Sequence, residues 1–262
     1  MDIPFYQIDA FTDRVFSGNP AGVCFLDRWL EDSILQSIAA ENNVSETAFL
    51  VPAGNRYELR WFTPKVEVDL CGHATLASAF AVFEYINPQA QQVEFQTQSG
   101  LLSVARQGDL LMMDFPARRP EPCPPPEHLA EILGIPPLQT LRARDLLVVY
   151  EEEEQVRRLQ PDLKRVAALE PFAVIVTAPG KNSDFVSRFF APKVGIPEDP
   201  VTGSAHCSLI PYWSERLGKK ELHALQLSER GGELFCLDRG DRVSIGGKAT
   251  AYLSGTIRIG TL

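Results

Sequence analysis

Short stretches of alternating or continuous apolar residues predict a chain rich in β-strands. In the first half we expect strands over residues 3–9, 23–26, 47–51, 57–63, 93–97, 101–106 and 110–115. In the second half we expect strands over residues 146–150, 172–177 and 185–190, and a closing meander over 243–245, 249–253 and 256–259. Gly18–Gly22 is expected to form a turn, and Gln107–Asp109 a hairpin turn.

Two segments have the pattern of helices. Apolar residues at helical spacing predict one helix over about residues 31–41. Residues 74–85 are good helix formers with almost no polar face, and a helix that is apolar all round must be buried on every side. This segment is too short to cross a bilayer, so we expect it to run through the middle of a curved sheet. A third helix is expected after Gly203, with Pro211 ending or kinking it early.

The chain is expected to consist of two similar halves. Residues 116–126 hold six prolines, a density that favours a linker. The predicted domains are residues 1–117 and 118–262, with the last strand able to return to the first domain. Pro64-Lys65-Val66 recurs as Pro192-Lys193-Val194, and each triplet precedes a glycine-containing turn and small residues, which indicates duplication.

Composition narrows the class of protein. The chain has 262 residues, 45% of them hydrophobic, and a net charge of −9, which fit a globular protein. Its basic residues are scattered, so a nucleic acid partner is not expected. No apolar run is long enough for a membrane span, and the first residues lack a signal-peptide pattern. Five cysteines without a CxxC spacing favour free thiols and a cytoplasmic location.

Two predicted helix starts are candidates for binding an anion. The first turns of these helices begin near Gly72 and Gly203, and their free N–H groups and positive dipole ends favour a carboxylate. Small residues at these starts, Gly72, Ala74, Gly203 and Ala205, would let a ligand approach the backbone. Each glycine could instead simply make a tight turn. If both starts face one cleft, they would grip a small acidic substrate.

Glu46 and Asp199 are the candidate acid/base residues. Glu46 lies at a helix-to-strand junction in an otherwise apolar run, where it is either an exposed turn residue or a carboxyl in a dry pocket, whose pKa burial would raise. Asp199 is the natural second carboxylate. His73 is either a capping or core histidine or part of this site. Cys71 is either a reactive thiol near a helix start or an inert buried one.

Motifs for other chemistries do not occur in the sequence. We find no GxGxxG, GxxxxGK[ST], GxSxG or HExxH pattern. The four histidines form no metal-ligand array with cysteines at a zinc spacing. We therefore expect neither a nucleotide cofactor nor a metal.

Four motifs, in this order along the chain, resemble those of the phenazine-biosynthesis PhzF-like family. They are Gly18-Asn19-Pro20-Ala21-Gly22, Ser45-Glu46-Thr47-Ala48-Phe49, Asp69-Leu70-Cys71-Gly72-His73-Ala74-Thr75 and Glu198-Asp199-Pro200-Val201-Thr202-Gly203-Ser204-Ala205. The resemblance implies an α+β, diaminopimelate-epimerase-like fold. In that fold, two pseudo-symmetric lobes each wrap a curved mixed sheet around a central buried helix. It also implies a homodimer that uses no cofactor.

The resemblance further implies an isomerase that moves a proton between carbons of a small carboxylic acid of the dihydro-hydroxyanthranilate type. It makes Glu46 the acid/base residue, with Asp199 and His73 as its catalytic partners. It assigns substrate binding to a set of small and polar residues: Asn19, Gly72, Ala74, Gly203 and Ser204. Two alternatives stay open. One is an amino-acid epimerase or racemase that uses Cys71, although the second thiol of such enzymes is missing near Pro200-Val201. The other is a non-catalytic small-molecule binder.

Overall fold

The structure is a computed structural model that describes residues 1–260 and divides into two compact units. Unit 1 consists of Met1–Asp114 and the end of the chain from Gly246, and unit 2 consists of Phe115–Ile245. The division therefore lies slightly before the expected break at residue 117. The end of the chain belongs to unit 1 because β18 (Ala249–Arg258) pairs with β1 (Asp2–Ala10) along its whole length.

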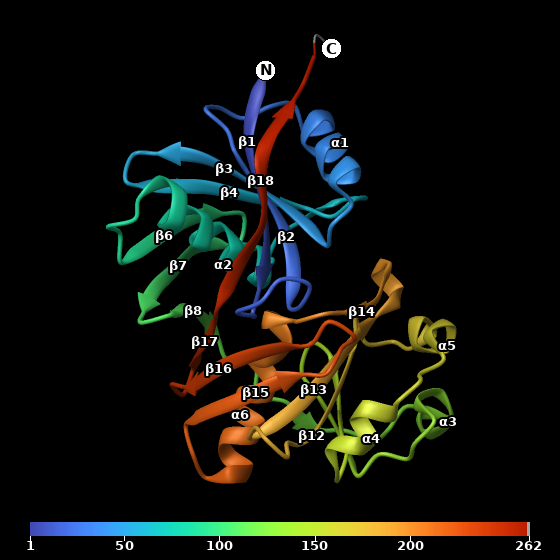
Figure 1. The fold of residues 1–262 in the computed structure, drawn as a ribbon. Helices are drawn as coiled ribbons and strands as arrows, with labels where there is room; N and C mark the ends of the chain where they lie inside the picture. Colours follow the sequence, from blue (N-terminus) through green and yellow to red (C-terminus); the bar gives the residue numbers. More distant parts are fainter. Residues whose placement is uncertain (261–262) are drawn as a thin grey trace. The chain divides into compact units, whose positions relative to one another are not determined.

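Unit 1 is a mixed sheet with two helices (Figure 1). Its remaining strands are β2 (Asn19–Phe25), β3 (Glu46–Ala53), β4 (Arg56–Phe62), β5 (Glu67–Val68), β6 (Gln92–Thr97), β7 (Gly100–Gln107) and β8 (Leu110–Pro116). Strand β1 is antiparallel to β18 and β2, β2 is parallel to β3, and β3, β4 and β5 are antiparallel in turn. Strand β4 is also parallel to β6, which continues antiparallel into β7 and β8.

Unit 2 repeats this order. Its strands are β9 (Glu121–Pro122), β10 (Gln139–Arg142), β11 (Leu146–Val149), β12 (Val174–Pro179), β13 (Phe185–Ala191), β14 (Ile196–Asp199), β15 (Glu221–Gln226), β16 (Gly232–Asp238) and β17 (Arg242–Gly247). Strand β10 is antiparallel to β9 and β11, β11 is parallel to β12, and β12, β13 and β14 are antiparallel in turn. Strand β13 is also parallel to β15, which is antiparallel to β16. Because directions and order match strand for strand, the predicted duplication is supported by topology.

The helices are few and mostly short. They are α1 (Asp32–Asn42), α2 (Gly72–Ala81) with its π-helical extension η1 (Val82–Ile86), α3 (Leu129–Leu133), α4 (Glu153–Arg158), α5 (Leu163–Ala168), the 3₁₀ turn η2 (Pro192–Val194) and α6 (Gly203–Leu217). In unit 2, α3, α4 and α5 supply buried apolar residues to one core cluster with β11, β12 and β13. In unit 1, α1 packs its buried face on β3 and β4.

Helix α2 is the all-apolar segment predicted from the sequence, and it is buried as expected. It contacts β1, β2 and β3, and its residues from His73 to Ala79 are all buried. The polar side chains of Thr75 and Ser78 donate hydrogen bonds to the carbonyls of Cys71 and Ala74, one turn earlier, at 2.6 and 2.7 Å. These bonds satisfy the hydroxyls inside the helix, which lets the helix be buried on all sides.

Helix α6 corrects one expectation. It continues through Pro211 to Leu217 instead of ending early. Proline lacks an N–H, so the carbonyl of Cys207, four residues earlier, has no donor within the helix. The backbone N–H of Arg118, in the proline-rich segment after β8, donates to that carbonyl at 2.8 Å. A partner from outside the helix thus replaces the missing bond.

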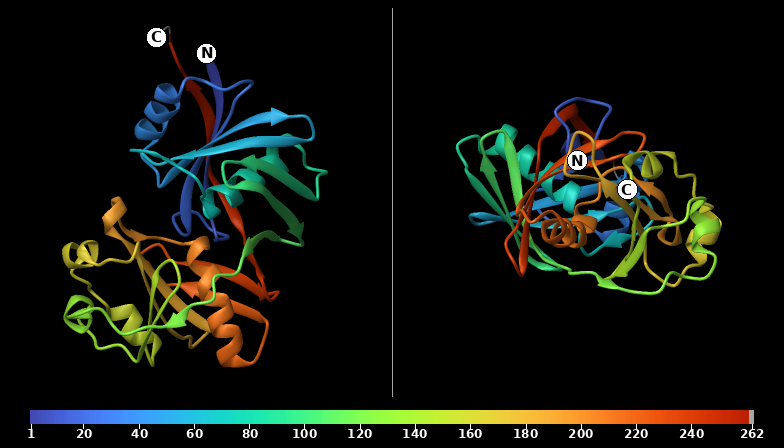
Figure 2. Two further views of the ribbon diagram at one scale, coloured as in Figure 1. Left: turned by 180° about the vertical axis from the view of Figure 1, so that it is seen from behind. Right: turned by 90° about the horizontal axis from the view of Figure 1, so that it is seen from below.

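Three other predictions were wrong. The segment Gly18–Gly22 is not a turn, because Asn19 already pairs with Ala10 in the β1–β2 ladder. The two closing strands around Gly255 form the single strand β18, whose ladder with β1 continues through that glycine. Several strands of unit 2, including β10, β15 and β16, were not predicted. The ends of β1 and β18 lie side by side (Figure 2), and Met1 and Ile259 exchange backbone hydrogen bonds.

Candidate active site

The N-terminal ends of β2, β3 and α2 meet in unit 1. The parallel ladder of β2 and β3 places Ala21 opposite Glu46, so Asn19 and Glu46 are the first residues of neighbouring strands. His73 is the second residue of α2, which packs on both strands. Asn19, Glu46 and His73, which lie far apart in the sequence, are therefore close together in the structure. Asn19 and Glu46 are neighbours because parallel strands begin at the same edge of a sheet.

These side chains form one connected and buried group. His73 Nε2 lies 3.0 Å from Glu46 Oε2, and its Nδ1 lies 3.2 Å from Asn19 Nδ2. Glu46 is 7% exposed, His73 is 5% exposed and Asn19 is fully buried. Ser45 Oγ donates to Asn19 Oδ1 at 3.0 Å and so orients the amide. The imidazole is thus held between an amide on one side and a carboxylate on the other.

The contact between Glu46 and His73 is an ion pair without an aligned hydrogen bond. Glu46 Oε2 and His73 Nε2 are both buried, and neither atom has a hydrogen-bond partner among the described residues. A buried carboxylate oxygen that lacks a hydrogen bond is unusual, because native structures satisfy nearly all such atoms. Groups of this kind occur at sites where a ligand or reacting group completes the bonding.

Burial and nearby charges shift the pKa values of His73 and Cys71, the two titratable neighbours of Glu46. Burial lowers the pKa of His73, but the interactions with Cys71 and Glu46 outweigh burial and raise this pKa well above its usual value. Burial and the charge of Glu46 raise the pKa of the Cys71 thiol to about 11. Cys71 Sγ lies 3.5 Å from His73 Nδ1. At neutral pH the site therefore contains a histidine that favours the protonated form and a cysteine that favours the thiol.

The same group contains the donor atoms that a divalent metal would need. A carboxylate oxygen of Glu46, the sulfur of Cys71 and a ring nitrogen of His73 all lie within 4.8 Å of one another. Carboxylate, thiolate and imidazole are all ligands that zinc accepts. Spacing along the chain did not indicate a metal site, because Glu46 is distant in the sequence from Cys71 and His73.

The start of α2 lies beside this group. Its cap residue, Cys71, makes no side-chain hydrogen bond to the first turn. Gly72 and Ala74, on either side of His73 at the start of the helix, are small residues; Gly72 is partly exposed and Ala74 is buried. Such a helix start has N–H groups that can bind an anion.

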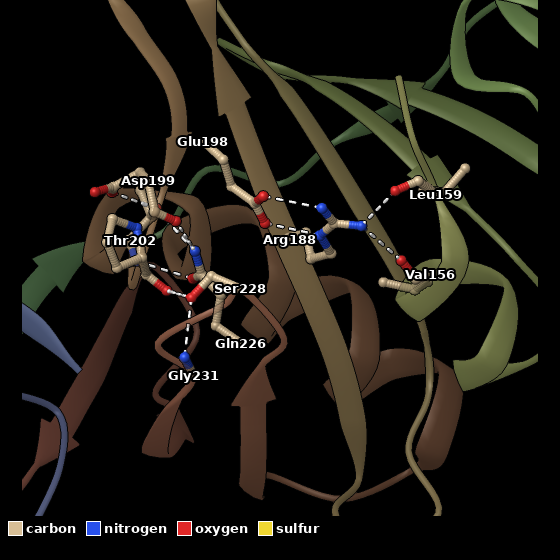
Figure 3. Close-up of polar contacts among 10 residues, drawn as sticks. Val156, Leu159, Arg188, Glu198, Asp199, Thr202, Gln226, Ser228 and Gly231 are labelled. Carbon is tan, nitrogen blue, oxygen red and sulfur yellow. Dashed lines mark hydrogen bonds and ion pairs between the residues drawn. The ribbon is translucent and has the colours of Figure 1, made fainter. Parts of the chain in front are cut away.

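In unit 2 the structure brings Asp199, Gly203 and Ser204 together. Asp199 ends β14, and Gly203 and Ser204 are the first two residues of α6. Thr202 Oγ1 donates to Asp199 Oδ2 at 2.5 Å (Figure 3). Ser204 Oγ accepts a hydrogen bond from Arg144 Nη2 at 3.4 Å. Asp199 is partly exposed, whereas Thr202 is buried.

The two units differ at equivalent positions. Gly72 and Gly203 both begin a central helix, and the strand registers pair Val68 with Trp61 and Asp199 with Phe189. Asp199 is therefore equivalent to Val68. By the same registers, Glu46 is equivalent to Ala173. Each unit thus carries one of the two candidate carboxylates, at a different place in the repeat.

The equivalence of the two units also shows which residue of unit 2 corresponds to Cys71. The residue before the helix start is Cys71 in unit 1 and Thr202 in unit 2. A second thiol would therefore be expected at Thr202 and not at Pro200-Val201. A threonine hydroxyl lacks the acidity of a thiol. Sequence reasoning also missed Gln226, which bonds to Thr202. It ends a strand that was not predicted, and no local signal marks it.

Two duplicated lobes that each enclose a buried helix define an α+β, diaminopimelate-epimerase-like fold. A hydroxyproline epimerase from Agrobacterium vitis superposes with a TM-score of 0.66 at 10% identity, covering 98% of this chain and 92% of that chain, which shows the shared fold. No helix in residues 1–260 is long and apolar enough to cross a membrane.

Sequence comparison assigns the family. Residues 8–255 match the family model described as phenazine biosynthesis-like protein, PhzC-PhzF. An uncharacterized isomerase of Pseudomonas aeruginosa is 54% identical, covering 99% of this chain and 100% of that protein. The crystal structure of a PhzF-family protein from Enterococcus faecalis has a TM-score of 0.97 and 46% identity, covering 99% of this chain and 100% of that one. The chain belongs to the PhzC-PhzF family and is an enzyme of the isomerase class.

Proposed function

We propose that this isomerase moves a proton between carbons of a small carboxylic acid, with Glu46 as the residue that takes and returns the proton. The observation that carries the proposal is the buried Glu46 carboxylate, whose Oε2 has no hydrogen-bond partner among residues 1–260 and lies 3.0 Å from His73. A buried carboxylate oxygen without a hydrogen-bond partner can accept a proton from a ligand that enters the site.

In the proposed step, Glu46 accepts a proton from a substrate carbon that neighbouring unsaturation has made acidic. The electron pair of the broken C–H bond moves into the conjugated system, and the double bond shifts. Glu46 then returns the proton to a different carbon, which leaves an enol that becomes a ketone. Atoms and electrons balance within the substrate, so the step requires no oxidant, reductant or cofactor.

His73, Asn19 and Asp199 have supporting roles in the proposal. His73 lies against the carboxylate, and in its protonated form its positive charge would offset the negative charge that develops on the substrate. Asn19 Nδ2 lies 3.2 Å from His73 Nδ1 and donates to it while that nitrogen carries no proton. Asp199 would orient polar groups of the substrate, and the start of α6 at Gly203 and Ser204 would bind its carboxylate. A dihydro-hydroxyanthranilate-type acid is the first substrate to test.

The chemistry of Cys71 argues against the alternative of a thiol-based epimerase. That reaction needs a thiolate, and the Cys71 pKa of about 11 leaves the sulfur protonated at neutral pH. The equivalent position in unit 2 is Thr202, which offers no second thiol. The proposal therefore assigns the base to Glu46.

The decisive experiment compares proton exchange by the wild-type protein and the Glu46→Gln variant. Each protein is incubated in D₂O with dihydro-hydroxyanthranilate and a panel of small unsaturated or amino carboxylic acids. NMR then follows isomerisation and deuterium at carbon. Glutamine keeps the shape of the side chain and removes the base, so we expect the rate to fall by about 100-fold or more. Glu41→Gln, the same change at an exposed glutamate of α1, is the matched control and should leave the rate unchanged.

Two outcomes would contradict the proposal. Full exchange by Glu46→Gln would show that another group is the base, and Cys71→Ala would then be tested. Tight binding of these acids without exchange by the wild-type protein would instead favour the non-catalytic binder.

A further inference from the structure

A chain of hydrogen bonds in unit 2 holds the Asp199 carboxylate in one orientation (Figure 3). It begins at Gln226, the last residue of β15, whose side chain is 1% exposed. Gln226 Oε1 accepts from the backbone N–H of Thr202 at 2.9 Å. Gln226 Nε2 donates to the Asp199 carbonyl at 2.8 Å and to Thr202 Oγ1 at 3.2 Å. Thr202 Oγ1 in turn donates to Asp199 Oδ2 at 2.5 Å.

Each bond in this chain sets the direction of the next. The Thr202 N–H can only donate, so it fixes which end of the Gln226 amide is the oxygen. The amide nitrogen must then donate to the Thr202 hydroxyl. A hydroxyl has one proton, and with its oxygen already accepting from Gln226 this proton points at Asp199. The result is a directed hydrogen bond to the Asp199 carboxylate, and such a bond is stronger than one between neutral groups when the carboxylate is ionised.

The duplicated unit provides an internal comparison. In both units a serine lies two residues after the equivalent strands, β6 in unit 1 and β15 in unit 2. Its hydroxyl donates a hydrogen bond to the loop that precedes the central helix. Ser99 donates to the Asp69 carbonyl and Ser228 donates to the Pro200 carbonyl, each at 2.8 Å. This serine hydrogen bond is therefore common to both units, and it does not depend on which unit carries the carboxylate.

The network around Asp199 is specific to unit 2. The residues equivalent to Asp199, Thr202 and Gln226 are Val68, Cys71 and Thr97. Thr97 turns back to its own hairpin, where its hydroxyl donates to the Gly100 carbonyl at 2.7 Å. Of the two repeats described, the one with Asp199 has the hydrogen bonds between Gln226, Thr202 and Asp199. The serine hydrogen bond to the loop occurs in both repeats.

A second anchor holds the strand just before Asp199. Arg188 makes two bonds to Glu198, at 2.7 and 2.9 Å, and its remaining nitrogen donates to the carbonyls of Val156 and Leu159. Figure 3 shows the Glu198 carboxylate bonded to Arg188, whereas Asp199 is bonded to Thr202 and Gln226. The side chain of Glu198 and the carbonyl of Asp199 are therefore both held, and the Asp199 carboxylate is bonded through Thr202.

We propose that Gln226 is a positioning residue for Asp199, acting through the Thr202 hydroxyl to aim the carboxylate at the substrate. The inference rests on the proposed function insofar as Asp199 orients the substrate. It adds a residue that no motif in the sequence marks.

The catalytic test uses the full-length protein and paired variants. Gln226→Leu and Thr202→Val each remove a link, and we expect each to lower kcat/KM by about 10- to 100-fold, the usual effect of losing an outer-shell partner. Thr202→Ser keeps the hydroxyl and should restore most of the activity. Thr97→Val, the equivalent position in unit 1, is the matched control and should have no effect on kcat/KM.

A double-mutant cycle separates positioning from general stability. If Gln226 acts through Asp199, Gln226→Leu should have little further effect in an Asp199→Ala background. The same 10- to 100-fold loss in both backgrounds would overturn the inference, because it would show a structural role. An unchanged kcat/KM in Gln226→Leu would also overturn it.

A separate measurement does not depend on turnover. In a ¹³C NMR titration of the Asp199 carboxyl group, Thr202→Val and Gln226→Leu should raise its pKa, because the ionised form loses a hydrogen bond. An unchanged titration in both variants would refute the inference. If the wild-type protein turned over none of the acids, the proposed function would fail, and this titration would still decide the role of Gln226.

Discussion

His206 is predicted to make unit 2 less stable as the pH falls. Its side chain is fully buried in α6, and its Nδ1 lies 2.8 Å from the Thr202 carbonyl. Its Nε2 is buried and has no hydrogen-bond partner in the described part of the chain, and its ring lies beside that of Phe185. Burial lowers the pKa of His206 from 6.5 to about 4, against the opposing effect of the Thr202 bond.

The sign and size follow from proton linkage. The pKa is lower in the folded state than in the unfolded state, so the unfolded state binds more protons when the pH falls below 6.5. The folding free energy that His206 contributes is present above that pH and is lost toward pH 4. Between pH 7 and pH 5 the loss is about 2 kcal/mol, and the full effect is about 3 kcal/mol.

The assay is urea unfolding at a series of pH values for the wild type and the His206→Asn variant. The amide nitrogen of asparagine takes the place of Nδ1 and can still donate to the Thr202 carbonyl, but it cannot become charged. The other titrating groups are the same in both proteins, so their effect cancels in the comparison. The difference in unfolding free energy between the two proteins should change by about 2 kcal/mol from pH 7 to pH 5, with the wild type losing more. Parallel pH curves for the two proteins would refute the reasoning.

Two further predictions concern unit 1. Cys71→Ala should keep most of the isomerase activity at neutral pH, because a thiol with a pKa of about 11 is not the base there; near-complete loss in the exchange assay would instead support a thiol mechanism. Gly18→Ala should lower the unfolding free energy by at least about 2 kcal/mol, because φ is +65° and the new Cβ would lie 2.1 Å from the Ala10 carbonyl oxygen. Gly54→Ala, at a similar φ with no atom within 4 Å, is the control, and equal losses in urea unfolding would show that the clash is unimportant.

Much of the fold could be predicted because its signals are local. The first-half strands and the helix over 32–42 follow from apolar periodicity, and the all-apolar segment after Gly72 could only be a buried helix. The repeated Pro-Lys-Val triplets indicated duplication, which the strand directions support. The errors lie where a distant partner decides the local structure. Pro211 stays inside α6 because Arg118 supplies the missing bond, and Gly255 stays inside β18 because β1 pairs along it.

For the candidate site, the amino-acid sequence by itself determined which side chains are available: one glutamate in an apolar run, a histidine at a helix start and a second carboxylate in the repeat. Only the tertiary structure decided their surroundings. The parallel register of β2 and β3 brings Asn19 and Glu46 to the same edge, where α2 adds His73. The pairing of β13 with β15 brings Gln226 to Thr202. Such contacts join residues far apart in the chain, so they depend on strand pairing, which local sequence patterns do not encode.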